Sequence, residues 1–422
     1  MNKKLIFPVR YKMVAGTFIL AMNVLIDRIF ISVAKEPVSE SLSFSDAQMG
    51  WVLSIFALGY ALFQTPTGIM ADKYGPRKIL TAVVTLWSVF AALSGAAWNF
   101  ISMLVVRFLF GAGEAGAFPA MSRAVFSWIP VKERGIVNGI NFSGGRVGAA
   151  VSMLFMPWLL HAAGWRMGFV YLSLIGFIWA VIWYWWFRDD PSDHSTISNE
   201  EKEFILKNRQ QQAVNTEKKI IPMSVLFGSK NMWLLMIQYF ASNFTFFFAL
   251  SWMFPHIQST YSLSPAQAGF YSAFPLIFGA LGNWTSGWMV DFFYKHVNIN
   301  FSRKFTGIVG FILAAGGLLV SVYMTTPFYA VVFLSLATFG ADMTLSPSWS
   351  VCNDTGKENS GAVSGTMNMA GNLGSFITAL AFPYLKDWSG SVLPFFFVGA
   401  ALNLVAVYLW TRIKPEKSIE EY

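Results

Sequence analysis

Long apolar segments with few charged residues recur along the whole chain. A helix needs about 20 apolar residues to cross the hydrocarbon core of a bilayer, and its backbone polar groups must be satisfied within the segment. Twelve segments meet this length, namely residues 12–34, 49–71, 79–97, 101–129, 135–160, 166–187, 231–255, 267–290, 305–324, 328–351, 360–385 and 390–411. The sequence therefore predicts an all-α membrane protein with twelve transmembrane helices.

Lysine and arginine residues between these segments gather in alternate loops. If the N-terminus is cytoplasmic, nearly all loop cations, Lys3 and Lys4 among them, fall in the cytoplasm, and only Lys35, Arg166 and Lys386 fall outside. Positively charged short loops favour the cytoplasmic side of a membrane, so we expect both termini to be cytoplasmic. The same asymmetry explains the net charge of +8, which therefore does not indicate a nucleic-acid partner.

Several classes of chemistry have no basis in the sequence. Charged residues make up 12% of the chain, about half the share of a soluble domain. The single cysteine, Cys352, excludes an intramolecular disulfide, and the four histidines lie too far apart for metal-ligand spacing. The chain has no Walker-type phosphate loop, no HExxH motif and no GxSxG motif. We therefore expect no metal, no cofactor, no enzymatic activity and no ATP-driven pumping.

The two halves of the sequence repeat each other. Residues 45–50 are similar in sequence to residues 264–269, and residues 68–72 are similar to residues 287–291, both at an offset of 219 residues. Glycines repeat at an offset of 226 residues, namely Gly135, Gly139, Gly145 and Gly148 with Gly361, Gly365, Gly371 and Gly374. Repeated halves are typical of secondary transporters with a site at mid-membrane between the halves. Small residues at helical spacing also allow close helix packing, which we take as the main reason for the glycines.

A highly charged segment separates the two halves at residues 188–230. Within it, Ser198 and Glu201 have the spacing of a capping box, which predicts a short helix from Ser198 to about Gln212. We therefore predict an N-terminal six-helix bundle at residues 1–187, a cytoplasmic linker at 188–230 and a C-terminal six-helix bundle at 231–422.

Charged residues inside the expected spans are the candidates for function. A charge at the centre of a membrane helix costs roughly 2.5–3.5 kcal/mol, so such residues face a protein interior or a wet cavity. Arg107 and Glu114 are seven residues apart and share one helix face, whereas the adjacent Asp27 and Arg28 point about 100° apart and serve different neighbours. The alternative is that these residues form structural ion pairs between helices, which is the role that we expect of Arg123.

Two motifs resemble signatures of the major facilitator superfamily. The loop after the second span reads Gly68-x-x-x-Asp72-Lys73-x-Gly75-x-Arg77-Lys78, and the fourth span holds Arg107-x-x-x-Gly111-x-Gly113, which resembles a signature of proton-coupled members. The resemblance implies two pseudo-symmetric six-helix bundles and transport by alternating access. It also implies a cytoplasmic conformational latch that includes Gly68, Asp72, Lys73, Gly75 and Arg77.

A finer resemblance is to the anion:cation symporter family, which includes bacterial carriers of galactonate, hexuronates and glucarate. The matching residues are Asp27-Arg28, Tyr60-x-x-x-Gln64-x-Pro66-x-Gly68, Glu114-Ala-x-Ala-Phe118-Pro119, Trp349-Ser350 and Asn368-x-x-Gly371-Asn372. The chain departs from the family in two places. Gly145-Arg146 stands where galactonate-type members carry an uncharged polar pair, and Asp342 lies inside the tenth span.

Together with the residue types, the resemblance implies a role for each candidate. The residues expected to bind substrate are Arg28, Tyr60, Gln64, Arg146, Asn243, Ser346, Ser348, Trp349, Asn368 and Asn372. The residues expected to couple protons are Asp27, Arg107, Glu114 and Asp342. Arg28 is the expected anchor, because a guanidinium offers two parallel hydrogen bonds to a carboxylate. For the polar lining residues, the alternative is hydrogen bonding between packed helices.

Particular pairings are expected among the buried charges. Protonation of Glu114 would free Arg107, and protonation of Asp27 would free Arg28 for the substrate. Arg146 and Asp342 are both expected near mid-membrane. Either they pair with each other when the site is empty, or each satisfies a different neighbour.

These observations predict a proton-coupled symporter of the bacterial inner membrane that imports an organic anion by alternating access. The expected anion is a sugar acid such as a hexuronate, an aldonate or an aldarate. The expected partners are this anion, protons and membrane lipid, and the protein is expected to be a monomer. The alternatives are a carrier of another carboxylate, such as tartrate or an aromatic acid, and a membrane sensor that binds the anion without transporting it.

Overall fold

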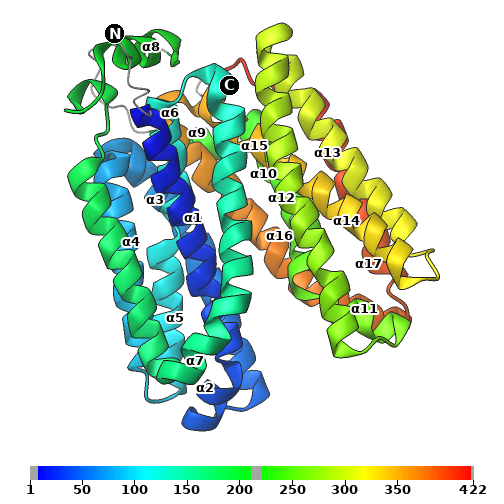
Figure 1. The fold of residues 1–422 in the computed structure, drawn as a ribbon. Coiled ribbons are helices and arrows are strands. Elements are labelled where there is room, and N and C mark those ends of the chain that lie inside the picture. The colour runs from blue at the N-terminus through cyan, green and yellow to red at the C-terminus, as the bar shows by residue number, and fades with distance from the viewer. Residues whose placement is uncertain (1–7, 211–220, 420–422) are drawn as a thin grey trace, which may run out of the picture. The chain divides into compact units, whose positions relative to one another are not determined.

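The computed structural model describes residues 8–210 and 221–419, and within these ranges the chain forms helices and short connections with no strand. The first half contains α1 (Val9–Val33), α2 (Lys35–Leu42), α3 (Asp46–Tyr74), α4 (Pro76–Gly95), α5 (Phe100–Glu114), α6 (Ala117–Trp128), η1 (Val131–Glu133) and α7 (Arg134–Trp186). The linker contains η2 (Pro191–Asp193), α8 (Asn199–Asn208) and α9 (Met223–Gly228). The second half contains α10 (Lys230–Ser251), α11 (Met253–Tyr261), α12 (Pro265–His296), α13 (Ile299–Ser321), α14 (Pro327–Met343), α15 (Leu345–Gly356), η3 (Lys357–Asn359), α16 (Ser360–Ser389) and α17 (Leu393–Arg412) (Figure 1). Lys3, Lys4 and the linker residues 211–220 lie outside the described residues.

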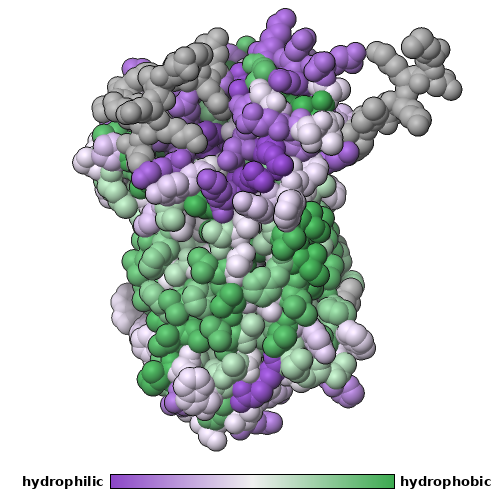
Figure 2. Space-filling view, turned by 90° about the vertical axis from the view of Figure 1, so that its left-hand side faces the viewer, coloured by the Kyte–Doolittle hydropathy of each residue, from purple (hydrophilic) through white to green (hydrophobic). Residues whose placement is uncertain are grey.

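Each expected span is made mainly of helix. Among the described residues, nine helical stretches are long and apolar enough to cross a membrane, and one of them, Pro327–Ser389, holds two expected spans. Two further expected spans lie in the first part of α7 and in α12. The number of twelve spans stays a prediction. On the face shown in Figure 2, hydrophobic residues form a broad band below a hydrophilic region. Side chains such as Ile178 and Ile182 on α7 are about 60% exposed, as expected of a surface that meets lipid.

Helix breaks differ from the sequence expectation in three spans, of which the one at 231–255 is divided into α10 and α11 at Trp252. The expected span at 101–129 is divided into α5 and α6 after Glu114, and the one at 328–351 is divided into α14 and α15 at Thr344. The reason is proline, which has no N–H to bond the carbonyl four residues earlier. Pro119 leaves the Ala115 carbonyl without that bond, and Pro347 does the same to the Met343 carbonyl. In α7, by contrast, Gly164 turns the chain at φ 71°, a left-handed conformation that suits glycine.

The internal repeat of the sequence is also a repeat of structure. Ser45 accepts a hydrogen bond from the Gln48 amide and begins α3 with a capping box, and Ser264 and Gln267 begin α12 in the same way. The repeated residues therefore set the start of equivalent helices.

Glycines of the second repeat lie where helices meet backbone to backbone. Gly139 packs against the Asn283 carbonyl on α12, and its equivalent Gly365 packs against the Gln64 carbonyl on α3. The later pair follows the same rule, with Gly148 against Met22 on α1 and Gly374 against Phe240 on α10. A side chain at these positions would collide with the neighbouring backbone, so the packing explanation accounts for the glycines.

The chain divides into two compact units. Unit 1 comprises Met1–Glu133, Gly144–Ile221 and Gly356–Gly365, and unit 2 comprises Arg134–Ser143, Pro222–Thr355 and Thr366–Tyr422. Thus α7 and α16 each give their first residues to one unit and the remainder to the other. The domain boundaries drawn from the sequence stay a prediction. Each unit has its own aromatic core, with Phe30 against Phe169 in unit 1 and Phe248 against Phe395 and Phe396 in unit 2.

The linker helix α8 also caps the start of the first transmembrane helix, α1. Ser198 caps α8 as expected, but Glu201 does not close the box on Ser198. Its carboxylate instead accepts hydrogen bonds from the backbone amides of Val9, at 2.9 Å, and Arg10, at 3.0 Å, in the first turn of α1. A carboxylate there satisfies amides that have no partner within the helix and complements the helix dipole. The helix ends at Asn208, and its expected end at Gln212 lies outside the described residues.

Candidate functional site

Four charged side chains from α1 and α5 gather inside unit 1. Arg28 on α1 donates from Nε to Glu114 Oε1 at 2.7 Å, and its Nη2 lies 2.7 Å from the same oxygen. Glu114 is fully buried, whereas the Arg28 side chain is 23% exposed. Arg107, on the same helix as Glu114, interacts electrostatically with Glu114 and Asp27 and is almost fully buried. The adjacent residues Asp27 and Arg28 thus serve different neighbours, as the sequence predicts.

The partner of Glu114 differs from the sequence expectation. Arg28, and not Arg107, makes the direct ion pair with this carboxylate. Glu114 is the last residue of α5, where the chain breaks before α6, and this position lets its carboxylate reach α1. Within the described residues, neither Nε nor Nη1 of Arg107 has a hydrogen-bond partner. The direct ion pair of this cluster is therefore the one between Arg28 and Glu114.

Aromatic rings of α3 and α5 cover the two guanidinium groups. The Arg28 guanidinium lies 4.2 Å from the centre of the Tyr60 ring, and that of Arg107 lies 4.7 Å from the centre of the Phe110 ring. Phe56 lies between them, 5.0 Å from Arg28 and 5.4 Å from Arg107. A cation over an aromatic face is stabilised by about 2 kcal/mol or more when desolvated. Tyr60, an expected substrate residue, thus positions Arg28, whereas no sequence pattern singles out Phe56.

Asp27 is the least satisfied acid of the cluster. It is 4% exposed, and Trp87 of α4 lies beside it without the geometry of a hydrogen bond to either carboxylate oxygen. Gln64, one turn beyond Tyr60 on α3, is also fully buried, and its amide has no hydrogen-bond partner among the described residues. Buried polar groups without hydrogen-bond partners are energetically costly.

The expected substrate residues of unit 2 fall into two groups. Ser346 and Ser348 are fully buried and engaged in helix packing: the Ser346 hydroxyl donates to the Gly135 carbonyl of α7 at 2.7 Å, and the Ser348 hydroxyl donates to Gln238 Oε1 of α10 at 3.2 Å. Their contacts fit the packing alternative. The second group lies around Gly371 of α16, which packs against Tyr239 and Asn243 of α10.

Two members of this second group keep part of their side chains accessible, whereas Trp349 and Asn368 are buried. Asn243 and Asn372 are half-buried, with their amides donating to the carbonyls of Tyr239 and Asn368 one turn earlier. Trp349 donates from Nε1 to the Tyr239 hydroxyl at 2.8 Å and packs on Phe142. Tyr239 therefore holds Trp349 in place. Sequence reasoning missed it because a lone tyrosine in an apolar span has no distinguishing signal.

The expected latch residues lie at the ends of α3 and α4. Asp72 accepts hydrogen bonds from the backbone amides of Gly361, at 2.9 Å, and Ala362, at 2.7 Å, in the first turn of α16. Arg123 lies 3.7 Å from Asp72, consistent with the structural role expected of it. Asp72 thus joins helices from the two halves of the sequence within unit 1.

The remaining latch residues shape the turn between α3 and α4. Gly75 has φ 85° and packs against the Asp189 carboxylate, which also accepts the Arg77 amide at 2.7 Å. Gly68 packs against the Gly361 carbonyl. Lys73 lies over the ring of Tyr74 at 5.0 Å.

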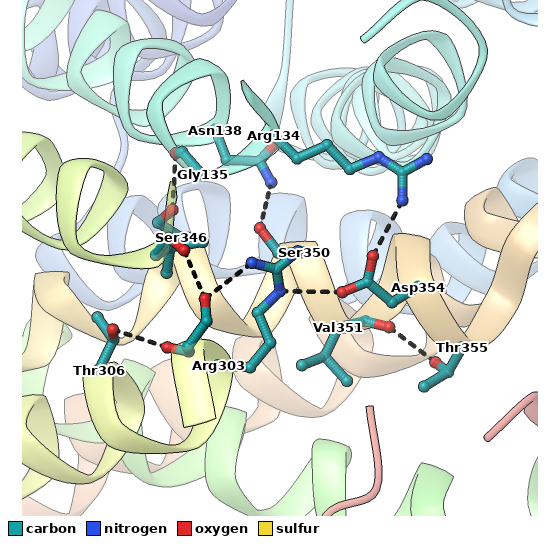
Figure 3. A network of polar contacts seen from close by, with 12 residues as sticks. Arg134, Gly135, Asn138, Arg303, Thr306, Ser346, Ser350, Val351, Asp354 and Thr355 are labelled. Atoms are coloured by element: carbon teal, nitrogen blue, oxygen red, sulfur yellow. Dashed lines mark hydrogen bonds and ion pairs between the residues drawn. The ribbon is translucent and has the colours of Figure 1, made fainter. Parts of the chain in front are cut away.

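A second site of the same kind, missed in the sequence, occurs in unit 2. Asp291, at the end of α12, accepts hydrogen bonds from the amides of Gly135 and Ile136 at 2.8 Å in the first turn of α7. Residue 291 is the repeat of residue 72 at the offset of 219, so the internal repeat carried a signal for it. Figure 3 shows the ion pairs beside it, in which Asp354 lies between Arg134 and Arg303 at 2.9 Å from each.

Arg146 and Asp342 belong to different units. Arg146 is half-buried in the unit 1 part of α7. Asp342 is 1% exposed near the end of α14, where its carboxylate packs against Gly279 of α12. Asp342 also stands five residues before Pro347, as Glu114 stands five before Pro119. Their pairing stays a prediction.

The family profile and the curated relatives that match this chain agree with one another. The profile of the Major Facilitator Superfamily matches residues 16–379. The probable sulfoacetate transporter SauU of Cupriavidus necator is 33% identical, with 90% of this chain and 89% of the relative covered. The probable galactarate/D-glucarate transporter GarP of Escherichia coli K12 is 31% identical over 89% and 88% of the two chains. The hexuronate transporter of Bacillus subtilis is 27% identical over 90% and 89%.

Solved structures share the fold at low sequence identity. The proton:xylose symporter XylE superposes with a TM-score of 0.77 at 15% identity, covering 98% of each chain. The human organic anion transporter MFSD10 gives a TM-score of 0.72 at 12% identity, covering 96% of this chain and all of the other. The relatives are transporters of anions, and the chain is a multi-pass membrane transporter rather than an enzyme. It belongs to the major facilitator superfamily, and its curated relatives place it in the anion:cation symporter family.

Proposed function

We propose that this protein is a proton-coupled symporter that imports an organic anion, a sugar acid of the hexuronate, aldonate or aldarate class, by alternating access. The anion class is supported by relatives named for galactarate/D-glucarate, hexuronate and sulfoacetate transport. The proposed orientation has both termini on the cytoplasmic side of a bacterial inner membrane, and the proposed oligomeric state is a monomer.

The ion pair between Arg28 and Glu114 carries the coupling proposal. While Glu114 is ionised, it occupies the guanidinium that is best suited to a substrate carboxylate. Protonation of Glu114 removes its charge, so that an incoming carboxylate can take its place on Arg28. Anion and proton binding then favour each other by a coupling free energy of about 1–3 kcal/mol, which corresponds to roughly 5- to 150-fold in affinity.

In this scheme, Arg107 and Asp27 connect the protonation of Glu114 to that of a second acid. Arg107 interacts electrostatically with both Glu114 and Asp27, so a change of charge on one acid is felt at the other. Asp27 is a second proton carrier in this scheme, because its buried carboxylate lacks a hydrogen bond within the described residues. In this scheme, the carrier reorients when both the anion and the proton are bound or when neither is bound, but not when only one is bound. This rule couples the flux of the anion to the flux of protons.

The substitution Glu114→Gln tests this scheme, because glutamine keeps the shape of a permanently protonated glutamate. Purified protein in proteoliposomes, assayed with D-glucarate and D-glucuronate, is expected to keep counterflow and to lose accumulation driven by a pH gradient. The matched control is Glu36→Gln, which replaces an exposed acid in α2. This variant should keep both counterflow and accumulation. Uphill uptake retained in Glu114→Gln would remove Glu114 from the mechanism. Binding without counterflow in the unaltered protein would favour a sensor.

A further inference from the structure

Arg107 is a buried cation next to the accessible guanidinium of Arg28. The exposed fraction of Arg107 is 2%, whereas 23% of the Arg28 side chain is exposed. Within the described residues, neither Nε nor Nη1 of Arg107 has a hydrogen-bond partner, and its interactions with Glu114 and Asp27 are electrostatic only. These N–H groups would bind a carboxylate directly if an anion reached them.

Two aromatic rings cover the Arg107 guanidinium, and one of them also lies against Arg28. The Arg107 guanidinium lies 4.7 Å from the centre of the Phe110 ring and 5.4 Å from the centre of the Phe56 ring. Phe110 is 1% exposed, whereas Phe56 is only half-buried, and its ring centre also lies 5.0 Å from the Arg28 guanidinium. Phe56 is therefore the part of the cover that lies next to the accessible guanidinium.

Close packing of α3 on α5 fixes the position of Phe56. A side-chain carbon at Gly111 would lie 2.2 Å from the Phe56 carbonyl oxygen, and one at Gly59 would lie 2.2 Å from the Phe108 carbonyl oxygen. The two helix backbones therefore touch at this level. Gly111 follows Arg107 by four residues on the same face of α5, so this contact places Phe56 beside the guanidinium.

Access of anions to Arg107 would weaken the proposed coupling. An anion that binds Arg28 must replace the Glu114 carboxylate, which contacts Arg28 at 2.7 Å, and this exchange is easier once Glu114 is protonated. An anion on Arg107 would displace no hydrogen-bonded carboxylate, so its binding would depend less on a proton. A carrier in which Arg107 is open to solutes would therefore carry anions across without protons.

We infer that Phe56 is a shield that closes Arg107 to anions at Arg28, and that this shield keeps anion binding dependent on the protonation of Glu114. The inference rests on the proposed transport function and adds to it a residue that makes the coupling strict. Phe56 contributes by excluding solutes from Arg107, and it binds neither the anion nor the proton.

Arginine modification tests the shield without a substrate. Purified full-length protein is treated with 2,3-butanedione, and modified arginines are located by mass spectrometry. In the unaltered protein, Arg107 should react more slowly than the accessible Arg28. In Phe56→Ala, Arg107 should react roughly tenfold faster, because the rate follows the fraction of molecules in which the guanidinium is accessible. Phe56→Leu keeps most of the volume of the ring, so the rate should rise less than about threefold.

Two controls separate the shield from general effects on the fold. Phe63→Ala makes the same change two turns farther along α3, where Phe63 is 41% exposed and packs on Phe108, and it should leave the Arg107 rate unchanged. Arg134 in unit 2 is fully buried and should stay unreactive in every folded variant. If Phe56→Ala unfolds by this criterion, Phe56→Val takes its place, and its Arg107 rate should exceed that of Phe56→Leu.

Proteoliposomes with D-glucarate as the probe test the consequence for coupling. Phe56→Ala should keep counterflow and lower the accumulation driven by a pH gradient about tenfold, within the range of the coupling free energy. Phe63→Ala should keep both activities.

The two experiments can fail separately. Equal Arg107 rates in Phe56→Ala and the unaltered protein, or an Arg107 that reacts as fast as Arg28 in the unaltered protein, would overturn the shield. Full accumulation in Phe56→Ala despite a reactive Arg107 would overturn its role in coupling. If the unaltered protein shows counterflow without accumulation under a pH gradient, the proposed proton coupling fails, and the modification rates still decide the shield.

Discussion

Arg28 is held by a carboxylate and an aromatic ring at the same time. Glu114 compensates its charge at 2.7 Å, and the Tyr60 ring supports the guanidinium at 4.2 Å. In the proposed mechanism, the ring would keep the guanidinium in place when the carboxylate leaves, since a cation–π contact does not require a counter-ion. If Arg28 binds the substrate as proposed, such a preformed site would lose little conformational entropy on binding.

His194 in the linker predicts a pH dependence of stability. Its ring is buried edge-on against Trp128 and Trp186, and burial, together with the nearby Arg188 cation, lowers the pKa of His194 below its usual value of 6.5. The fold therefore favours the neutral imidazole. Its contribution to stability is present above the unfolded pKa and is lost as the pH falls toward the folded pKa.

We expect the difference in melting temperature between the unaltered protein and His194→Gln to shrink between pH 7.5 and pH 5.5. The comparison uses thermal unfolding of both proteins in the same detergent, which removes pH effects from other groups. A difference that is constant across this range would contradict the account.

Among the elements, glycine faces decide how closely helices approach. A side-chain carbon at Gly317 of α13 would lie 2.6 Å from the Phe333 carbonyl oxygen and 2.5 Å from the Ala337 amide nitrogen of α14. One at the neighbouring Gly316 would have nothing within 4 Å. The two glycines occupy the same helix and differ in the face on which they lie. They therefore separate the effect of packing from that of helix propensity.

Gly317→Ala should destabilise the protein by about 1–3 kcal/mol, because the added methyl group forces α13 and α14 apart. Gly316→Ala is the matched control and should leave stability unchanged or raise it by up to about 1 kcal/mol, because alanine has the higher helix propensity. Thermal unfolding in detergent measures both. Equal effects of the two substitutions would show that packing between α13 and α14 is not the cause.

At the scale of the whole molecule, two aspartates cap helices from the other half of the sequence. Asp72 binds the first turn of α16 in unit 1, and Asp291 binds the first turn of α7 in unit 2. The bound amides have no partner within their own helices, so each carboxylate satisfies donors that would otherwise be open. We propose that both contacts are latches that are released during the transport cycle.

Asp72→Asn should speed amide hydrogen exchange in the first turn of α16 about tenfold, because a neutral side chain holds the amides less strongly. Asp291→Asn should do the same in the first turn of α7, and Asp193→Asn, an exposed linker acid, should change neither. Exchange followed by mass spectrometry resolves the two turns. Unchanged exchange at Gly361 in Asp72→Asn would count against the latch.

The sequence alone was sufficient to predict a helical membrane protein of the major facilitator superfamily. A bilayer admits only segments that satisfy their own backbone, so apolar length identifies helices without knowledge of their neighbours. The internal repeat likewise predicted equivalent starts for α3 and α12, because capping depends on residues that are adjacent in the chain. Motif residues identified the family for the same reason.

Tertiary structure decided the partners of the polar residues. The sequence favoured Arg107 as the partner of Glu114, because the two share a helix face, and only the packing of α1 against the end of α5 brings Arg28 to the carboxylate. The same is true of Ser346, whose hydroxyl donates a hydrogen bond to the Gly135 carbonyl, more than 200 residues away in the chain. The rotation and register of packed helices set these contacts, and they arise from the summed fit of many side chains that no local pattern encodes.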